Sequence, residues 1–262
     1  MENIFARNPR EREALSGTHI AFVGTGSVGS AIADMAARTG VGKLTLIDPE
    51  VLAPENLGRH VLTSTSLGKP KVAALAEHLR AVNPEIDIVS VQGRFQGEFP
   101  VKPDLIVSAV DSFSCESHVN TYALDEGVKT VFVGVWGEAR VAEIYYVIPG
   151  QTACYECFAS FRRQTLDVPT DPRKYTDPDF DETKVAGQPG LWANILLASS
   201  LAFQVCLGLC GVRSEIIDPE RNLLLFNISS YDSPLQPLAL TFARPQKGCA
   251  ICDESKLEEL TV

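Results

Sequence analysis

The sequence lacks three features that would each assign the chain to a particular class of protein. No uninterrupted apolar run approaches the roughly 20 residues that a membrane-spanning helix requires. The first residues, MENIFARNPRERE, contain no apolar segment of the kind found in a secretory signal. Basic residues are outnumbered, with 23 Lys and Arg against 33 Asp and Glu and a net charge of −10. We therefore expect a cytoplasmic protein that binds neither membranes nor nucleic acid.

The number of cysteines in the chain is odd. The chain has seven, and with no export signal this disfavours a disulfide framework and favours metal or thiol chemistry. Apolar residues are sufficient for a full core, because 45% of the 262 residues are hydrophobic and 21% are charged. We predict a single domain over residues 1–262, with an N-terminal arm at 1–16 and a long loop within 158–190.

The stretch His19–Asp48 predicts a nucleotide site. Ile20–Val23 is a short apolar run typical of a buried parallel strand, and a helix is expected over Ser27–Thr39. After the strand, three glycines have the spacing G-x-G-x-x-G: Gly24, Gly26 and Gly29. The first allows a tight turn, the second lets backbone N–H groups approach phosphate, and the third lets the helix pack closely. Asp48 ends the next strand, where its carboxylate can accept ribose hydroxyls. The pattern does not say which nucleotide binds.

Polar and cationic residues follow at the same edge of the expected sheet: Asn56, Arg59, His60, Lys69 and Lys71. An enzyme that splits ATP between its α- and β-phosphates must stabilise a pyrophosphate leaving group, and positive side chains do so. Surface charges on a loop and at the start of a helix explain the same residues equally well. In the N-terminal arm, arginines 7, 10 and 12 have a similar pair of interpretations: a solvated helical segment, or an arginine supplied to a phosphate site.

Further strands are expected at Asp87–Gln92, Leu105–Val110 and Thr130–Gly134, followed by an antiparallel one at Ala139–Ile148. The predicted class is α/β: a Rossmann-like sheet, parallel in its N-terminal part and antiparallel in its C-terminal part, with helices on both faces. Asp111 follows the fourth strand, where its carboxylate can hold Mg²⁺ or cap the next helix.

Two C-x-x-C motifs lie far apart in the sequence. Cys154 and Cys157 form the first, and Cys249 and Cys252 form the second. Four thiolates in this pattern are typical of a closed, structural Zn²⁺ site, which would fasten the C-terminal region to the sheet. The alternative is two unrelated thiol pairs.

Together these motifs resemble the ThiF/MoeB/HesA family, the bacterial relatives of ubiquitin-activating enzymes. The resemblance covers about Thr18–Cys252 and rests on GTGSVGS, LIDPEVLAPENLGRH, GKPKV, SAVDSFSCESHVN and the two C-x-x-C motifs, in that order. It implies ATP-dependent adenylylation of the C-terminal glycine carboxylate of a ubiquitin-like or sulfur-carrier protein, with release of pyrophosphate.

The resemblance also implies roles for individual residues. Gly24, Gly26 and Gly29 would line the nucleotide loop, and Asp48 would hold the ribose. Asn56, Arg59 and Lys71 would face the phosphates, and Asp111 would position Mg²⁺. In the family an arginine of the N-terminal arm often enters the site of the partner subunit; Arg7 is the favoured candidate, and a homodimer is implied.

One departure from the family concerns the crossover loop at 158–190. Thioester-forming members place a cysteine there, whereas this loop offers threonines: Thr165, Thr170, Thr176 and Thr183. The adenylate is therefore expected to pass directly to a sulfur donor or a conjugating enzyme; an oxyester, or use of Cys115, are the alternatives. Two other functions remain: an NAD-dependent oxidoreductase, and a non-catalytic, zinc-stapled partner subunit of an activating complex.

Overall fold

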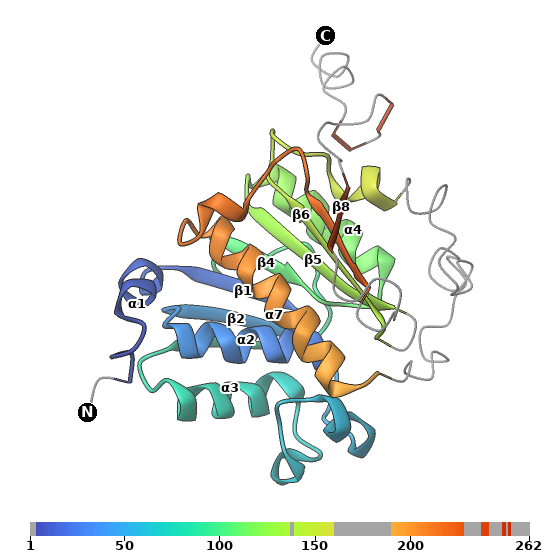
Figure 1. The fold of residues 1–262 in the computed structure, drawn as a ribbon. Helices are drawn as coiled ribbons and strands as arrows, with labels where there is room; N and C mark the ends of the chain where they lie inside the picture. The colour runs from blue at the N-terminus through green and yellow to red at the C-terminus, as the bar shows by residue number, and fades with distance from the viewer. Residues whose placement is uncertain are drawn as a thin grey trace.

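The structure is a computed structural model that describes residues 4–136, 139–159, 190–227, 237–240, 248–249 and 251–252. Its described strands form one eight-stranded sheet with the order β3-β2-β1-β4-β5-β6-β7-β8 (Figure 1). The strands are β1 His19–Val23, β2 Lys43–Asp48, β3 Asp87–Gln92, β4 Leu105–Ser108, β5 Lys129–Trp136, β6 Val141–Val147, β7 Leu223–Asn227 and β8 Pro237–Leu240.

The sheet has a parallel part and an antiparallel part, as predicted. Strands β1 to β5 pair in parallel, and β6, β7 and β8 continue the sheet by antiparallel pairing. The strand order reverses between β1 and β4, where Val23 pairs with Ile47 on one side and with Ser108 on the other. In open α/β sheets ligands bind at such a reversal, outside the carboxyl ends of the strands.

Helices cover both faces of the sheet, which confirms the predicted architecture (Figure 1). Helices α2, α3 and α7 lie on one face, and α4 lies on the other. The helices are α1 Pro9–Leu15, α2 Ser27–Thr39, α3 Lys71–Val82, α4 Phe113–Asp125 and α7 Trp192–Leu209. Short 3₁₀ helices are η1 Pro54–Arg59, η2 Ser64–Ser66 and η4 Ser214–Ile216.

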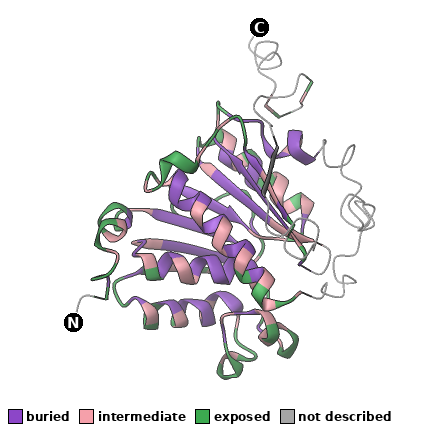
Figure 2. Ribbon diagram, in the orientation of Figure 1, coloured by how far each residue is buried: buried purple, intermediate pink, exposed green. Residues whose placement is uncertain are grey.

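The core has two layers because side chains alternate between the faces of each strand. In β2, Leu44 and Leu46 belong to the layer beneath α2, α3 and α7, whereas Ile47 belongs to the layer beneath α4. Figure 2 shows the central strands largely buried and the helices as a mixture of buried, intermediate and exposed residues. Helix α7 has the length and composition of a membrane span, but here it packs against α2 and β5 and contributes many buried residues. It is therefore a core helix.

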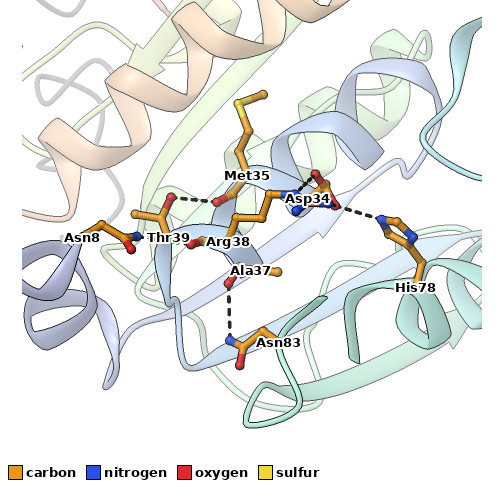
Figure 3. A network of polar contacts seen from close by, with 8 residues as sticks. All are labelled: Asn8, Asp34, Met35, Ala37, Arg38, Thr39, His78 and Asn83. Atoms are coloured by element: carbon orange, nitrogen blue, oxygen red, sulfur yellow. Dashed lines mark hydrogen bonds and ion pairs between the residues drawn. The ribbon is translucent and has the colours of Figure 1, made fainter. Parts of the chain in front are cut away.

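Polar contacts join the outer ends of the helices on the first face (Figure 3). Asp34 of α2 accepts hydrogen bonds from Arg38 at 2.6 Å and pairs with His78 of α3 at 2.8 Å. These two partners lower the pKa of Asp34 and outweigh the opposing effect of burial. Asn83, directly after α3, donates to the Ala37 carbonyl at 3.4 Å. The contacts fix the second half of α3 against α2.

Candidate functional site

The three glycines of the motif lie in the turn after β1 and in the first turn of α2, and they differ in the space around them. Gly24 has a φ of +90°, and a β-carbon there would lie 2.5 Å from the Ala109 carbonyl oxygen. At Gly29 a β-carbon would lie 2.0 Å from the Gly24 oxygen, so α2 packs directly on the loop. At Gly26 it would meet no atom of the described residues within 4 Å. Open space therefore adjoins the second glycine at the N-terminus of α2, where a phosphate can meet backbone N–H groups.

Asp48 lies buried next to this loop at the end of β2. Its Oδ2 accepts a hydrogen bond from Thr25 N at 2.7 Å, and its Oδ1 accepts one from Glu50 N at 2.8 Å. Each carboxylate oxygen has a second lone pair, so the same group can still accept a ribose hydroxyl. The two backbone bonds hold the carboxylate in one orientation beside the glycine loop.

Lys71 is brought to the same edge by the first turn of α3. Its side chain is only 5% exposed, and its Nζ forms an ion pair and hydrogen bond with Glu50 Oε2. The backbone reinforces this contact, because Lys71 N donates to Glu50 O at 2.9 Å. Glu50 was not identified from the sequence. Its only signal is its position two residues after Asp48, in the segment that leaves the second strand.

The segment η1 carries the two remaining phosphate candidates. Asn56 Oδ1 accepts a hydrogen bond from Ala53 N at 3.0 Å, which closes the first turn of η1. The side-chain carbonyl of Asn56 therefore stabilises its own segment through this hydrogen bond. Arg59 is half-buried at the end of η1, and its Nη1 lies 3.7 Å from the point where a β-carbon of Gly190 would be. The Arg59 side chain thus extends from the end of η1 towards the segment that leads into α7.

His60 follows Arg59 and is buried against the glycine loop. Its Nε2 lies 2.9 Å from Thr25 O, and its Nδ1 accepts from Leu62 N at 3.1 Å. Burial, together with the smaller effect of the nearby Lys71 ammonium, lowers the pKa of His60 to about 4. The imidazole is therefore neutral at physiological pH. The sequence places His60 near the site but does not predict this contact.

Asp111 is exposed three residues beyond the end of β4. The predicted strand was two residues too long: β4 ends at Ser108, and the next residue, Ala109, lies against Gly24 of the glycine loop. The suggestion that Asp111 caps the next helix is wrong. Ser112 occupies the N-cap position of α4, and its Oγ accepts from Cys115 N at 3.4 Å. The Asp111 carboxylate is thus placed outside the helix cap, at the ligand edge of the sheet.

The N-terminal arm lies at the other end of α2. Asn8 donates from Nδ2 to the Arg38 carbonyl at 3.2 Å (Figure 3), and Arg12 pairs with Glu85 at 3.0 Å. Helix α2 has 13 residues, so its two ends are about 20 Å apart. The arm therefore does not bring Arg7 to the glycine loop of its own chain. Any contact of Arg7 with phosphate requires a second copy.

A cavity of about 260 Å³ adjoins the site on the α4 side of the sheet. It is bordered by Ile47, directly before Asp48, and by the segment after β3, where the Phe95 and Phe99 rings are 4.7 Å apart. Arg94 and Glu98 add charged groups to this lining. The cavity offers apolar and aromatic surface next to the acid at the end of β2.

The four cysteines of the C-x-x-C motifs converge into one cluster. Their sulfur atoms all lie within 4.8 Å of one another. Cys154 Sγ is 4.0 Å from Cys157 and 3.8 Å from Cys249, and Cys157 Sγ is 3.4 Å from Cys252. Zinc–sulfur bonds of about 2.3 Å in a tetrahedron place sulfurs about 3.8 Å apart, so the cluster fits Zn²⁺. The alternative of unrelated thiol pairs is excluded by this convergence.

The threonines that the sequence offers in place of a crossover-loop cysteine, Thr165, Thr170, Thr176 and Thr183, lie outside the described residues. Cys115 lies in the first turn of α4 and is partly exposed.

Comparison with known proteins assigns the chain to a family. A model described as the ThiF family matches residues 3–249. The chain belongs to the ThiF family. Among curated proteins, ubiquitin-like modifier-activating enzyme 5 of Drosophila simulans is 32% identical to this ThiF-family chain over 167 residues, which is 56% of the chain and 41% of that protein. The corresponding protein of Branchiostoma floridae is 33% identical over 156 residues, 53% of the chain and 38% of that protein. The chain spans about two fifths of the length of the curated relatives it matches.

Solved structures share the fold of this ThiF-family chain. E. coli MccB with ATP has a TM-score of 0.73 at 18% identity and covers 96% of this chain and 75% of its own. MccB in complex with N-formylated MccA has a TM-score of 0.74, also at 18% identity, and covers 95% and 75%. Selenomethionine PaaA has a TM-score of 0.65 at 17% identity. At these identities the similarity establishes the fold.

Proposed function

We propose that this ThiF-family chain binds ATP at the β1–β4 reversal and adenylylates the C-terminal carboxylate of a ubiquitin-like or sulfur-carrier protein. One observation carries the proposal. The open space over Gly26, the buried Asp48 and the cationic residues Arg59 and Lys71 belong to segments that meet at one edge of the sheet. The relatives support it, because they include proteins named ubiquitin-like modifier-activating enzymes and MccB solved with ATP.

The residues then have distinct tasks. The glycine loop and the N-terminus of α2 receive phosphate oxygens, and Asp48 accepts the ribose hydroxyls. The cavity beside Ile47 offers apolar surface for the adenine base. Arg59 and Lys71 offset the repulsion between an attacking carboxylate and the triphosphate. Mg²⁺, when held by Asp111, would add positive charge at the phosphates.

In the reaction a carboxylate oxygen of the carrier attacks the α-phosphorus. A new P–O bond forms, the bond to the β-phosphate oxygen breaks, and pyrophosphate leaves with that electron pair. An acyl-adenylate remains. We propose that it passes directly to a sulfur donor or conjugating enzyme, and that the site is completed in a homodimer by Arg7 of the second copy.

The test mixes the purified chain with ATP, Mg²⁺ and a small carrier ending in glycine, and follows the carrier by mass spectrometry. The proposal predicts that the mass of the carrier increases by one adenylyl group. It also predicts that the enzyme carries no thiol-sensitive covalent adduct of the carrier. A thiol-sensitive enzyme–carrier adduct would contradict the direct transfer but not the adenylylation. Absorbance changes with NADH in the absence of any adenylylated carrier would instead favour an oxidoreductase.

A further inference from the structure

The imidazole of His60 connects two segments of the candidate nucleotide site. Its Nδ1 lies 3.1 Å from Leu62 N, and a backbone N–H can only donate, so Nδ1 is the acceptor. In the neutral ring the proton is then on Nε2, which donates to the Thr25 carbonyl at 2.9 Å. One nitrogen therefore serves the local turn after η1, and the other reaches across to the glycine loop.

Thr25 is held from both sides by these contacts. Its N–H donates to Asp48 at 2.7 Å, and its carbonyl accepts from His60. Thr25 is itself fully buried and lies between Gly24 and Gly26. The orientation of the peptide groups beside Gly26 thus depends on Asp48 at one end and on His60 at the other.

The surroundings of His60 keep it in the form that makes both bonds. The ring is 6% exposed, and the charged groups that act on it are Lys71 and Asp48, with His78 of α3 further contributing. A protonated ring would have a donor at Nδ1 facing the Leu62 N–H, so only the neutral ring fits this position.

We propose that His60 is a positioning residue of the nucleotide site: its Nε2–H holds the Thr25 peptide so that the loop over Gly26 is preformed for phosphate, and it fixes the Arg59 segment against that loop. This inference rests on the proposed function, because the ligand is the triphosphate of ATP. The ring itself need not touch the nucleotide.

Two substitutions separate the two bonds of His60. In His60→Gln the amide nitrogen takes the place of Nε2 and can donate to Thr25 O. In His60→Asn the amide oxygen takes the place of Nδ1 and can accept from Leu62 N, but the side chain is too short to reach Thr25. We expect ATP affinity within about threefold of wild type for Gln, and at least about tenfold weaker for Asn, a difference of about 1.4 kcal/mol. ATP is titrated by calorimetry, and hydrogen exchange of the glycine loop is measured without ATP.

The matched control is His78→Asn, which alters a histidine hydrogen bond between α3 and α2 away from the loop (Figure 3). It should lower thermal stability and leave ATP affinity unchanged. For His60→Asn we expect faster exchange in the glycine loop than for wild type or His60→Gln. Equal ATP affinity of the Asn and Gln variants would overturn the inference. If the wild-type protein bound no ATP, the proposed function would fail. Faster hydrogen exchange of the glycine loop in His60→Asn, but not in His60→Gln, would still establish that His60 holds the loop.

Discussion

Single buried polar residues define the candidate site more sharply than its exposed charges do. Asp48 and His60 are each about 95% buried, and both bond to the same residue, Thr25. Buried polar groups need partners, because an unmet one costs about 1–3 kcal/mol. These contacts therefore stabilise the fold and, at the same time, fix the loop that would receive phosphate.

The lowered pKa of His60 predicts a pH dependence of stability. The folded protein resists protonation until about pH 4, whereas an unfolded chain takes up the proton near pH 6.5. The contribution is complete above pH 6.5 and is lost as pH falls towards 4, by up to about 1.4 kcal/mol per pH unit. Denaturant unfolding of wild type and His60→Gln between pH 4 and 7 measures this. The wild-type curve should fall more steeply; parallel curves would show that His60 does not titrate in this way.

At this scale the sequence predicted a set of candidate residues but not the hydrogen bonds that they form. The spacing of the glycines and of Asp48 follows local rules of strand, turn and helix, so it can be read directly. Glu50 and Thr25 escaped notice because their contacts depend on tertiary structure. The partner of Lys71 is 21 residues away, and Thr25 and His60 are 35 residues apart.

The elements around the glycine loop were predictable because each carries a strong local pattern. Helix α2 and strand β3 have the predicted bounds. The errors fell at the ends of elements: β4 stops early where Ala109 meets Gly24, β5 is longer and β6 shorter than predicted, and Ser112 rather than Asp111 caps α4. Propensity does not indicate which of two adjacent polar residues will reach a free N–H of the helix.

Alanine at two of the glycines should separate folding from binding. Gly29→Ala places a methyl group 2.0 Å from the Gly24 oxygen, so the free energy of unfolding should fall by about 1–3 kcal/mol. Gly26→Ala points into open space and makes no steric clash, so stability should fall by no more than about 1 kcal/mol, the cost of alanine at a helix N-cap. Its methyl group would occupy the phosphate position, and ATP affinity should fall at least about tenfold.

Denaturant unfolding and ATP titration of the two variants provide the measurements. Normal ATP affinity in Gly26→Ala would show that the space over this glycine is not where phosphate binds.

At the scale of the whole molecule, the cysteine cluster joins distant parts of the chain. Cys154 and Cys157 follow β6, and they meet Cys249 and Cys252, whose pairings span 95 residues in sequence. The sequence predicted this meeting from motif spacing alone, because tetrahedral zinc chemistry specifies the ligands without reference to the fold.

Removal of the metal should therefore destabilise the protein. We expect about one Zn²⁺ per chain by elemental analysis, and loss of about 3 kcal/mol or more of unfolding free energy after chelation, since a ligand at 100 times its Kd contributes about 2.7 kcal/mol. Cys249→Ser should lose the zinc, whereas the control Cys210→Ala, outside the cluster, should keep it. A metal-free protein of unchanged stability would contradict the structural role of the cluster.

The most direct test of the proposed adenylylation is ATP–pyrophosphate exchange by the purified full chain. Radiolabelled pyrophosphate should enter ATP only when a glycine-ended carrier is present, and not when its terminal glycine is deleted. Arg59→Ala should reduce the exchange rate on the order of 10²–10³-fold, the usual effect of losing one electrostatic stabiliser of the transition state. Exchange that is absent with every such carrier, or that is unaffected by Arg59→Ala, would contradict the account.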